Sequence, residues 1–349
     1  MGEKRREGET LAPRPVRQAK PTFLSLPSRS PTIPKLHKGA PPMKDTFAGM
    51  HWMLATPFND DESLDLPSVK KLVDKAAESG CVGVVALGEM GEWRRLSDYE
   101  RNQVLDAVMA AAGKRLLVTV GTTATGTLVG VQRAKEAAKA GAAAVMVSPP
   151  PFAKPNPAAV QAFYQRVAGA ITIPLVVQDF PQTSGVHMSP QFIADLAKAI
   201  PGFKYLKLED PPTPPKISRI KELTGDRLGI FGGLGGVFLL DELRRGGIGA
   251  MTGFAYPEAL VEIIRLSFAG DDKKAAELFN KYLPLILYEG QDGIGLSIRK
   301  EAIKGRGLMA SARARHPAPA IDDASRRELT HLIQSLRPDL IKPAAATKP

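Results

Sequence analysis

Between about residue 50 and residue 269, short apolar runs alternate with amphipathic stretches. This alternation predicts strand–helix units, because buried strands are short apolar runs and surface helices are apolar on one face only. The predicted strands span residues 51–57, 82–88, 115–120, 143–148, 174–180, 203–209, 228–232 and 248–254. The predicted helices span residues 66–79, 97–112, 127–140, 156–170, 189–200, 214–224, 237–246 and 257–269.

Helix boundaries carry their own signals. Ser97 stands three residues before Glu100, the spacing of a capping box, and Ser189 precedes a proline at the first helical position. These signals support the helices that the apolar pattern predicts. Glycines, which readily adopt the backbone conformation that ends a helix, follow several of them: Gly80, Gly113, Gly141, Gly225, Gly246 and Gly270.

Eight consecutive units favour an α/β fold, the (β/α)8 TIM barrel. The alternative is a doubly wound open sheet, which usually has fewer repeats and a glycine-rich turn after its first strand. Here the first strand runs into Thr56-Pro57-Phe58-Asn59, which contains no glycine. Three later helical stretches predict a C-terminal extension that covers the barrel or builds an oligomer interface: residues 272–289, 295–308 and 324–336.

The predicted domain order follows from these patterns. Residues 1–44 hold eight prolines and no apolar period, so we expect a disordered N-terminal extension. Met43 is a candidate for the true start, in which case the native protein would lack that extension. The barrel is predicted over residues 45–270, the helical region over 271–341 and a frayed tail over 342–349.

Composition excludes several classes of function. The net charge is +11, but residues 1–44 alone hold ten Lys or Arg and three Glu, so the remaining chain carries little excess charge. Nucleic-acid-binding proteins usually carry a basic stripe with interleaved aromatic residues, and this sequence has none. No apolar run is long enough for a membrane span. The single cysteine, Cys81, excludes internal disulfides and fits a reducing, cytoplasmic compartment.

Lys207 is the most informative residue in a predicted strand. Strand alternation places Tyr205, Lys207 and Glu209 on one face, which points into the barrel near its C-terminal mouth. A buried lysine is costly unless it is paired or neutral, and a neutral amine is a nucleophile toward carbonyl groups. The residue therefore suggests Schiff-base chemistry. The alternative is a structural lysine paired with Glu209 or Glu89.

Other polar groups follow the ends of neighbouring strands. Glu89 lies in the turn Gly88–Glu92 and is a candidate general acid or base if burial keeps it protonated, or else an ion-pair partner of Lys207. Gln178 is an inward-facing polar residue of the fifth strand. Phe152, after three prolines, is a candidate pocket-lining or interface residue. The glycines of residues 232–236 allow a backbone to approach a ligand, although a tight turn explains them equally well.

No metal or cofactor is indicated by the sequence. The five histidines are scattered, and none stands with a cysteine or carboxylate at the spacing of metal ligands. Neither a phosphate-binding P-loop nor a nucleophile elbow is present. We therefore expect chemistry carried by side chains alone.

Several short segments match one family pattern in register. They are Ala55-Thr56-Pro57-Phe58, Gly88-Glu89-Met90-Gly91-Glu92 with Leu96, Ser97 and Glu100 downstream, Lys154-Pro155, Pro181 with Gly185, Lys207, and Gly249-Ala250-Met251-Thr252-Gly253. Together, from about Phe47 to Met309, they resemble the dihydrodipicolinate synthase / N-acetylneuraminate lyase family. The resemblance implies a barrel enzyme in which a strand-six lysine, here Lys207, forms a Schiff base with a 2-oxo acid such as pyruvate. It also implies a homotetramer.

The departures from the family pattern concern proton transfer. Glu89 and Met90 stand where the family has two threonines, Gln178 and Phe152 where it has tyrosines, and Thr183 where the synthases have an arginine. The hydroxyl relay of the synthases is therefore missing. A glutamine does not shuttle protons at neutral pH, and a phenylalanine has no proton to donate.

We therefore expect a lysine-dependent lyase that acts on a 2-oxo acid or sugar-acid derivative by aldol cleavage, condensation or dehydration. The alternatives are a 4-hydroxy-tetrahydrodipicolinate synthase joining pyruvate to aspartate semialdehyde with an altered relay, and a non-catalytic binding pseudoenzyme. A further alternative is an unrelated barrel enzyme that acts on phosphosugars. The predicted catalytic residues are Lys207, Glu89 and Gln178. The predicted substrate-binding residues are Gly88, Met90, Gly91, Thr56, Phe152, Thr183, Gly232, Gly233 and Thr252.

Overall fold

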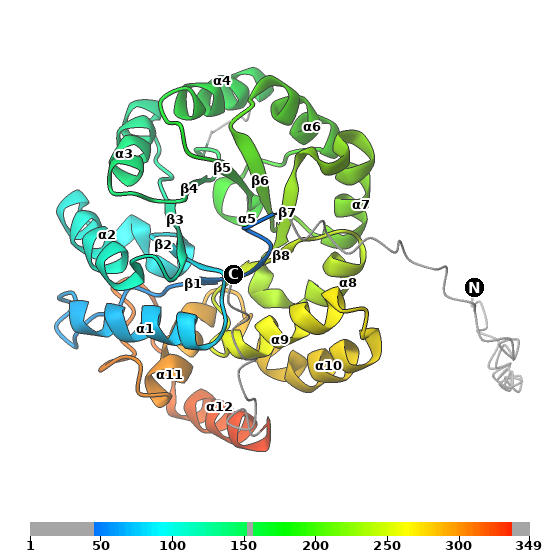
Figure 1. The fold of residues 1–349 in the computed structure, drawn as a ribbon. Helices are drawn as coiled ribbons and strands as arrows, with labels where there is room; N and C mark the ends of the chain where they lie inside the picture. The colour runs from blue at the N-terminus through cyan, green and yellow to red at the C-terminus, as the bar shows by residue number, and fades with distance from the viewer. Residues whose placement is uncertain (1–44, 152–155, 337–349) are drawn as a thin grey trace, which may run out of the picture. The chain divides into compact units, whose positions relative to one another are not determined.

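The computed structural model describes residues 45–151 and 156–336. Eight parallel strands form a closed barrel in which each strand pairs with the next along the chain and β8 returns to β1 (Figure 1). The predicted TIM barrel is therefore confirmed. Its strands are β1 Gly49–Met53, β2 Gly83–Ala86, β3 Leu117–Gly121, β4 Ala144–Val147, β5 Leu175–Asp179, β6 Phe203–Leu208, β7 Gly229–Gly232 and β8 Gly249–Thr252.

Helices surround the barrel (Figure 1). The outer helices are α1 Leu66–Glu78, α2 Asp98–Ala112, α3 Thr127–Lys139, α4 Pro157–Ala168, α6 Pro190–Ala199, α7 Thr213–Thr224, α8 Leu239–Arg244 and α9 Pro257–Phe268. Short helical turns that the apolar pattern did not predict follow several strands: η1 Glu89–Gly91, η2 Trp93–Arg95, α5 Pro181–Ser184 and η4 Leu234–Gly236, with η3 Gly225–Arg227 before β7. Three of these turns, η1, α5 and η4, come directly after β2, β5 and β7, at the mouth of the barrel.

The predicted helix boundaries have the expected capping geometry. The Ser97 hydroxyl accepts a hydrogen bond from the Glu100 backbone N–H at 3.2 Å, and the Glu100 carboxylate accepts one from the Ser97 N–H at 2.9 Å. Ser189 caps α6 through the Phe192 N–H at 3.1 Å. These bonds satisfy N–H groups that have no partner within a helix, and so they fix where α2 and α6 begin.

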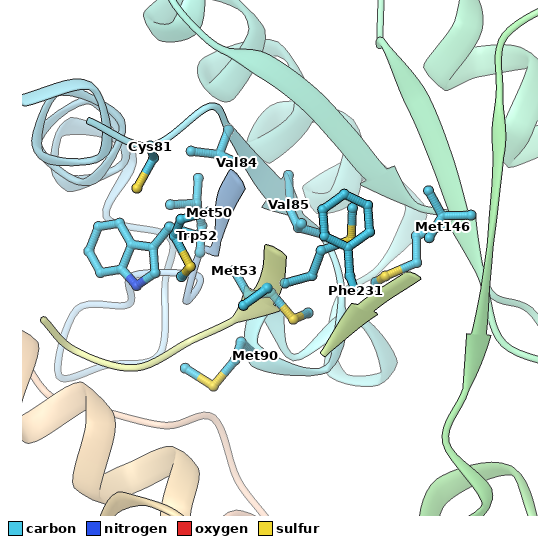
Figure 2. Close-up of a cluster of buried hydrophobic side chains, with 14 of the residues drawn as sticks. Met50, Trp52, Met53, Cys81, Val84, Val85, Met90, Met146 and Phe231 are labelled. Carbon is cyan, nitrogen blue, oxygen red and sulfur yellow. The ribbon is translucent and has the colours of Figure 1, made fainter. Parts of the chain in front are cut away.

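Each strand divides its side chains between the barrel interior and the helices. On β1, Met53 points inward, whereas Trp52 points outward and donates its ring N–H to the Phe254 carbonyl at 2.9 Å. Figure 2 shows Met53 with Phe231 and Met146 on one side of β1 and Trp52 with Cys81 on the other. This end of β1 is therefore apolar on both faces, as expected of a parallel sheet covered by helices.

The first strand begins and ends earlier than predicted, at Gly49–Met53 instead of residues 51–57. Pro57 has no backbone N–H to continue the ladder, and Phe58 instead pairs antiparallel with Leu64, so the chain turns back there. At the other end, β1 and β8 approach so closely that a Cβ on Gly249 would lie 1.9 Å from the Gly49 carbonyl oxygen. Glycine therefore permits the closure of the barrel at this seam.

The helical extension comprises α10 Asp272–Glu289, α11 Gly295–Gly305 and α12 Asp323–Leu336. α10 packs on α9 and contacts both α11 and α12. The predicted N-terminal extension and the frayed tail lie outside the described residues. Within the described ranges, no helix has the length and apolar character that crossing a membrane requires.

Candidate active site

A pocket of about 870 Å³ opens at the C-terminal ends of the strands. Its floor comes from the barrel, and part of its wall comes from α10, α11 and the loop between them. The extension therefore helps to build the pocket. The residues on which the following argument depends are Met53, Met90, Gln178, Lys207, Thr252 and Arg299.

Lys207 lies on β6 at the base of this pocket and is 1% exposed. Its amine is 2.9 Å from a Glu209 carboxylate oxygen and 3.0 Å from the Met53 sulfur. The two outward residues of this strand, Leu206 and Leu208, are fully buried against the helices. Strand alternation thus places an amine and a carboxylate side by side inside the barrel, as the sequence pattern indicated. Of the two partners considered for Lys207, the ion pair forms with Glu209.

Glu209 is the centre of a hydrogen-bonded chain. The oxygen that meets Lys207 also accepts a 2.7 Å hydrogen bond from the Gln178 amide, and the other oxygen accepts one from the Leu234 N–H at 3.2 Å. The Gln178 carbonyl oxygen accepts a 3.0 Å hydrogen bond from Ser148. Gln178 therefore orients the carboxylate that faces the amine.

The glycines after β7 make room for carboxylates of the chain itself. A Cβ on Gly233 would lie 2.3 Å from the Glu209 side chain, and one on Gly232 would lie 1.8 Å from an oxygen of Glu242. Glu242 accepts a 2.6 Å hydrogen bond from the Thr213 hydroxyl, and burial raises the pKa of its carboxyl to about 8. The two glycines, which have no side chains, thus leave room for Glu209 and for a second buried carboxylate, Glu242, behind it.

The turn after β2 holds Glu89 against Trp93 and Arg94. The Glu89 carboxylate accepts a 2.9 Å hydrogen bond from the Trp93 ring and lies 3.4 Å from Arg94. Glu89 does line the pocket, and no side chain caps the N-terminus of η1. Its role as proton carrier stays a prediction, and its contacts are with residues at the rim.

A buried ion pair anchors this turn to the extension. Lys300 on α11 lies 2.7 Å from the Glu92 carboxylate and 2.9 Å from the Thr56 carbonyl, and both charged side chains are fully buried. Glu92 therefore anchors this loop to α11. Glu92 has a φ of 54°, a left-handed conformation that costs a residue with a side chain of the order of 1–3 kcal/mol. The pair therefore holds a strained loop in place.

The predicted binding residues divide into two groups. Met90, Thr183 and Thr252 line the pocket. Thr56 and Gly91 instead bond to each other, with the Thr56 hydroxyl donating to the Gly91 carbonyl at 2.7 Å. Gly88 packs against Met53, since a Cβ there would lie 2.5 Å from the Met53 methyl group. Phe152 lies outside the described residues.

Sequence reasoning missed two pocket residues, Arg299 on α11 and Glu289 at the end of α10. Glu289 is fully buried, and burial raises the pKa of its carboxyl to about 7 although Arg299 nearby lowers it. Both residues come from the extension, whose position over the barrel no short-range pattern specifies. The signal available in the sequence was that α10 and α11 each carry a charged residue, Glu289 or Arg299, on the apolar face. Within the described ranges, no group of three or more His, Cys, Asp or Glu side chains gathers as metal ligands do.

Comparison with known proteins agrees with this geometry. Residues 46–336 match the model of the dihydrodipicolinate synthetase family. An L-2-keto-3-deoxyarabonate dehydratase of Azospirillum brasilense is 33% identical over 84% of this chain and 96% of its own length. A dihydrodipicolinate synthase structure from Rhodopseudomonas palustris is 37% identical, with a TM-score of 0.78 over 83% of this chain and 97% of that chain. A monomeric dihydrodipicolinate synthase variant, 23% identical, shares the fold with a TM-score of 0.78 over 83% of this chain and 96% of that chain.

The barrel and its pocket thus define an enzyme of the lyase class, as predicted. The chain belongs to the dihydrodipicolinate synthetase family, with which the sequence resemblance agrees. Gln178 and Thr183 mark it as a divergent member.

Proposed function

We propose that the protein is a Schiff-base lyase that dehydrates a 2-oxo acid bearing a hydroxyl group at C4, with Lys207 as the nucleophile. The observation that carries this proposal is the buried Lys207 amine beside the Glu209 carboxylate at the base of the pocket. A carboxylate in contact accepts the proton that an amine must lose before it attacks a carbonyl carbon.

The reaction balances with these two groups. The Lys207 nitrogen bonds to C2, and the carbonyl oxygen leaves as water to give an iminium ion. Glu209 then removes a proton from C3, and the electron pair forms an enamine. The C4–O bond breaks as the hydroxyl group takes a proton from Glu209 and leaves as water. Hydrolysis of the unsaturated iminium frees Lys207, so that one water is lost overall.

Glu209 is the proton carrier that the geometry favours. It lies 2.9 Å from the Lys207 amine, and the Gln178 amide fixes its orientation at 2.7 Å. A positioned carboxylate typically contributes about 10²- to 10⁴-fold as a general acid or base. In this role Gln178 is a positioning residue, which gives the substitution of the family tyrosine a physical function.

The turn that carries Glu89 and Met90 is the proposed site for the substrate carboxylate. Gly88 precedes η1 in an extended conformation without a side-chain cap, so backbone N–H groups at this end are available to an anion. Met90 and Thr252 border the same pocket. This arrangement would orient C2 toward Lys207.

The second candidate is synthesis of 4-hydroxy-tetrahydrodipicolinate, which the 37% identity to a dihydrodipicolinate synthase structure favours. The dehydratase relative and the absence of an arginine at Thr183 favour dehydration. The non-catalytic alternative does not explain why a buried amine lies at the base of an open pocket.

A direct assay separates these candidates. Purified protein is incubated with 2-oxo-3-deoxypentonate, and mass spectrometry follows the loss of one water. A parallel reaction holds pyruvate, aspartate semialdehyde and the downstream reductase. We expect dehydration without coupled reductase turnover. Reductase turnover without dehydration would favour the synthase, and inactivity in both assays would contradict the proposed lyase.

Self-association and location are also proposed. Leu128 and Val129 on α3 are neighbouring large apolar residues exposed on the surface, which suits contacts between subunits. We expect a homotetramer, as in the family, although the monomeric variant has the same fold. Light scattering during gel filtration measures the mass. A cytoplasmic location fits the single buried cysteine.

A further inference from the structure

Arg299 projects from α11 into the pocket wall without a strong acceptor. Its Nη1 meets only the Met90 sulfur, at 3.6 Å, and its Nε is 3.7 Å from a Glu289 oxygen, too far for a hydrogen bond. Within the described part of the chain, no oxygen accepts a hydrogen bond from this guanidinium. An unsatisfied charged donor is costly when its side chain is 84% buried, so the arrangement calls for an explanation from function.

Glu289, beside it, is also incompletely satisfied. One oxygen accepts a 3.1 Å hydrogen bond from the Ala255 N–H, and the other is buried without a partner among the described residues. The side chain is fully buried, yet it belongs to the pocket lining together with Arg299. Thus an unused N–H donor and an unused carboxylate oxygen stand together at one wall.

The pair is close enough to the reaction centre to serve one ligand. A Cβ on Gly235 would lie 3.0 Å from the Arg299 Nη2, and the N–H of the neighbouring Leu234 donates a 3.2 Å hydrogen bond to Glu209. Glu209 in turn contacts Lys207 at 2.9 Å. A ligand bonded to Lys207 through C2 therefore extends its far carbons into the pocket that Arg299 also lines.

We infer that Arg299 and Glu289 form a subsite for the hydroxyl groups at the far end of the 2-oxo acid. A hydroxyl group accepts a hydrogen bond from the guanidinium and donates one to the carboxylate, so a single group type satisfies both. A carboxylate at the far end would meet Arg299 favourably but Glu289 unfavourably. The inference rests on the proposed function and specifies its substrate class as polyhydroxylated monocarboxylic acids.

The test compares three 2-oxo acids by borohydride trapping on Lys207. Pyruvate has no far end, 2-oxo-3-deoxypentonate ends in hydroxyl groups, and 2-oxoglutarate ends in a carboxylate. Half-saturating concentrations are measured for wild type, Arg299→Met, Arg299→Lys and Glu289→Gln. Arg265→Met on α9 is the matched control, since Arg265 is half-exposed and pairs with Glu262 at the surface. Circular dichroism establishes that each variant is folded.

The quantity to compare is the half-saturating concentration of the hydroxylated acid divided by that of pyruvate. We expect Arg299→Met to raise this ratio by about 10- to 100-fold, because the variant loses a hydrogen bond from a charged group. Arg299→Lys should restore part of that loss, and Glu289→Gln should raise the ratio as well. A purely structural role would weaken all ligands alike and leave the ratio unchanged.

Two results would overturn the subsite. In the first, Arg299→Met still forms adducts, but its ratio of half-saturating concentrations stays within about twofold of the wild-type ratio. That result would contradict the subsite and leave the proposed Schiff base standing. The other is tighter binding of 2-oxoglutarate than of the hydroxylated acid by wild type. If no acid formed an adduct in wild type, the proposed function itself would fail.

Discussion

At the scale of single residues, the site depends on one amine and one carboxylate that strand alternation places side by side. Lys207 and Glu209 are two positions apart on β6, so both face the barrel interior. Neither is stable there alone, because a buried charge requires a partner. The pair thus satisfies a structural need and supplies a nucleophile with a base.

Glu209→Gln tests the proton carrier. The amide keeps the size of the side chain but accepts no proton, so kcat should fall by about 10²- to 10⁴-fold. Glu89→Gln should cost less, because Glu89 contacts Trp93 and Arg94 rather than Lys207. Steady-state kinetics on the hydroxylated substrate measure both. A larger loss from Glu89→Gln would return the role of proton carrier to Glu89.

At the scale of elements, the extension supports the loops that form the pocket. Lys300 on α11 binds Glu92, and Arg315 after α11 binds Glu100 on α2 through both carboxylate oxygens, at 2.7 and 3.0 Å. These contacts tie the turn after β2 and the first turn of α2 to residues of the extension more than 200 positions later in the chain. The loop conformation around Met90 therefore depends on the extension.

Lys300→Met tests the buried pair. Removing one partner leaves Glu92 as a less compensated buried charge, so we expect a loss of about 3–5 kcal/mol in the free energy of unfolding. Lys273→Met is the matched control on α10, where the exposed lysine lies 4.0 Å from Glu277, and should change stability by less than about 0.5 kcal/mol. Urea denaturation gives both values. Equal midpoints for the two variants would contradict this account.

The Arg315–Glu100 contact predicts a dependence of stability on pH. The hydrogen bond from Arg315 is the largest cause that lowers the pKa of Glu100 from 4.5 to about 2. A carboxyl group with a lowered pKa stabilises the fold above its unfolded pKa, and this contribution is lost as pH falls from about 4.5 to about 2. Thermal unfolding of wild type and Glu100→Gln across this range measures it. The difference between them should shrink as pH falls, and a constant difference would refute the assignment.

At the scale of the whole molecule, local patterns predicted the barrel because each strand and helix carries its own periodicity and caps. The same patterns predicted Lys207 and Glu209 on one face. They did not predict Arg299 or Glu289, because only tertiary packing places α10 and α11 over the barrel mouth. The contacts of Glu89 with Trp93 and Arg94 were likewise beyond reach, since η1 and η2 are irregular turns without a repeating pattern.

The central claim is that Lys207 forms a covalent bond with 2-oxo acids. Borohydride trapping with pyruvate, followed by peptide mass mapping, tests it most directly, with Lys204→Ala as the control at an exposed position of the same strand. We predict a reduced adduct on Lys207 in wild type and in Lys204→Ala, and none in Lys207→Ala. A protein that forms no adduct, or forms it on another lysine, would contradict the account.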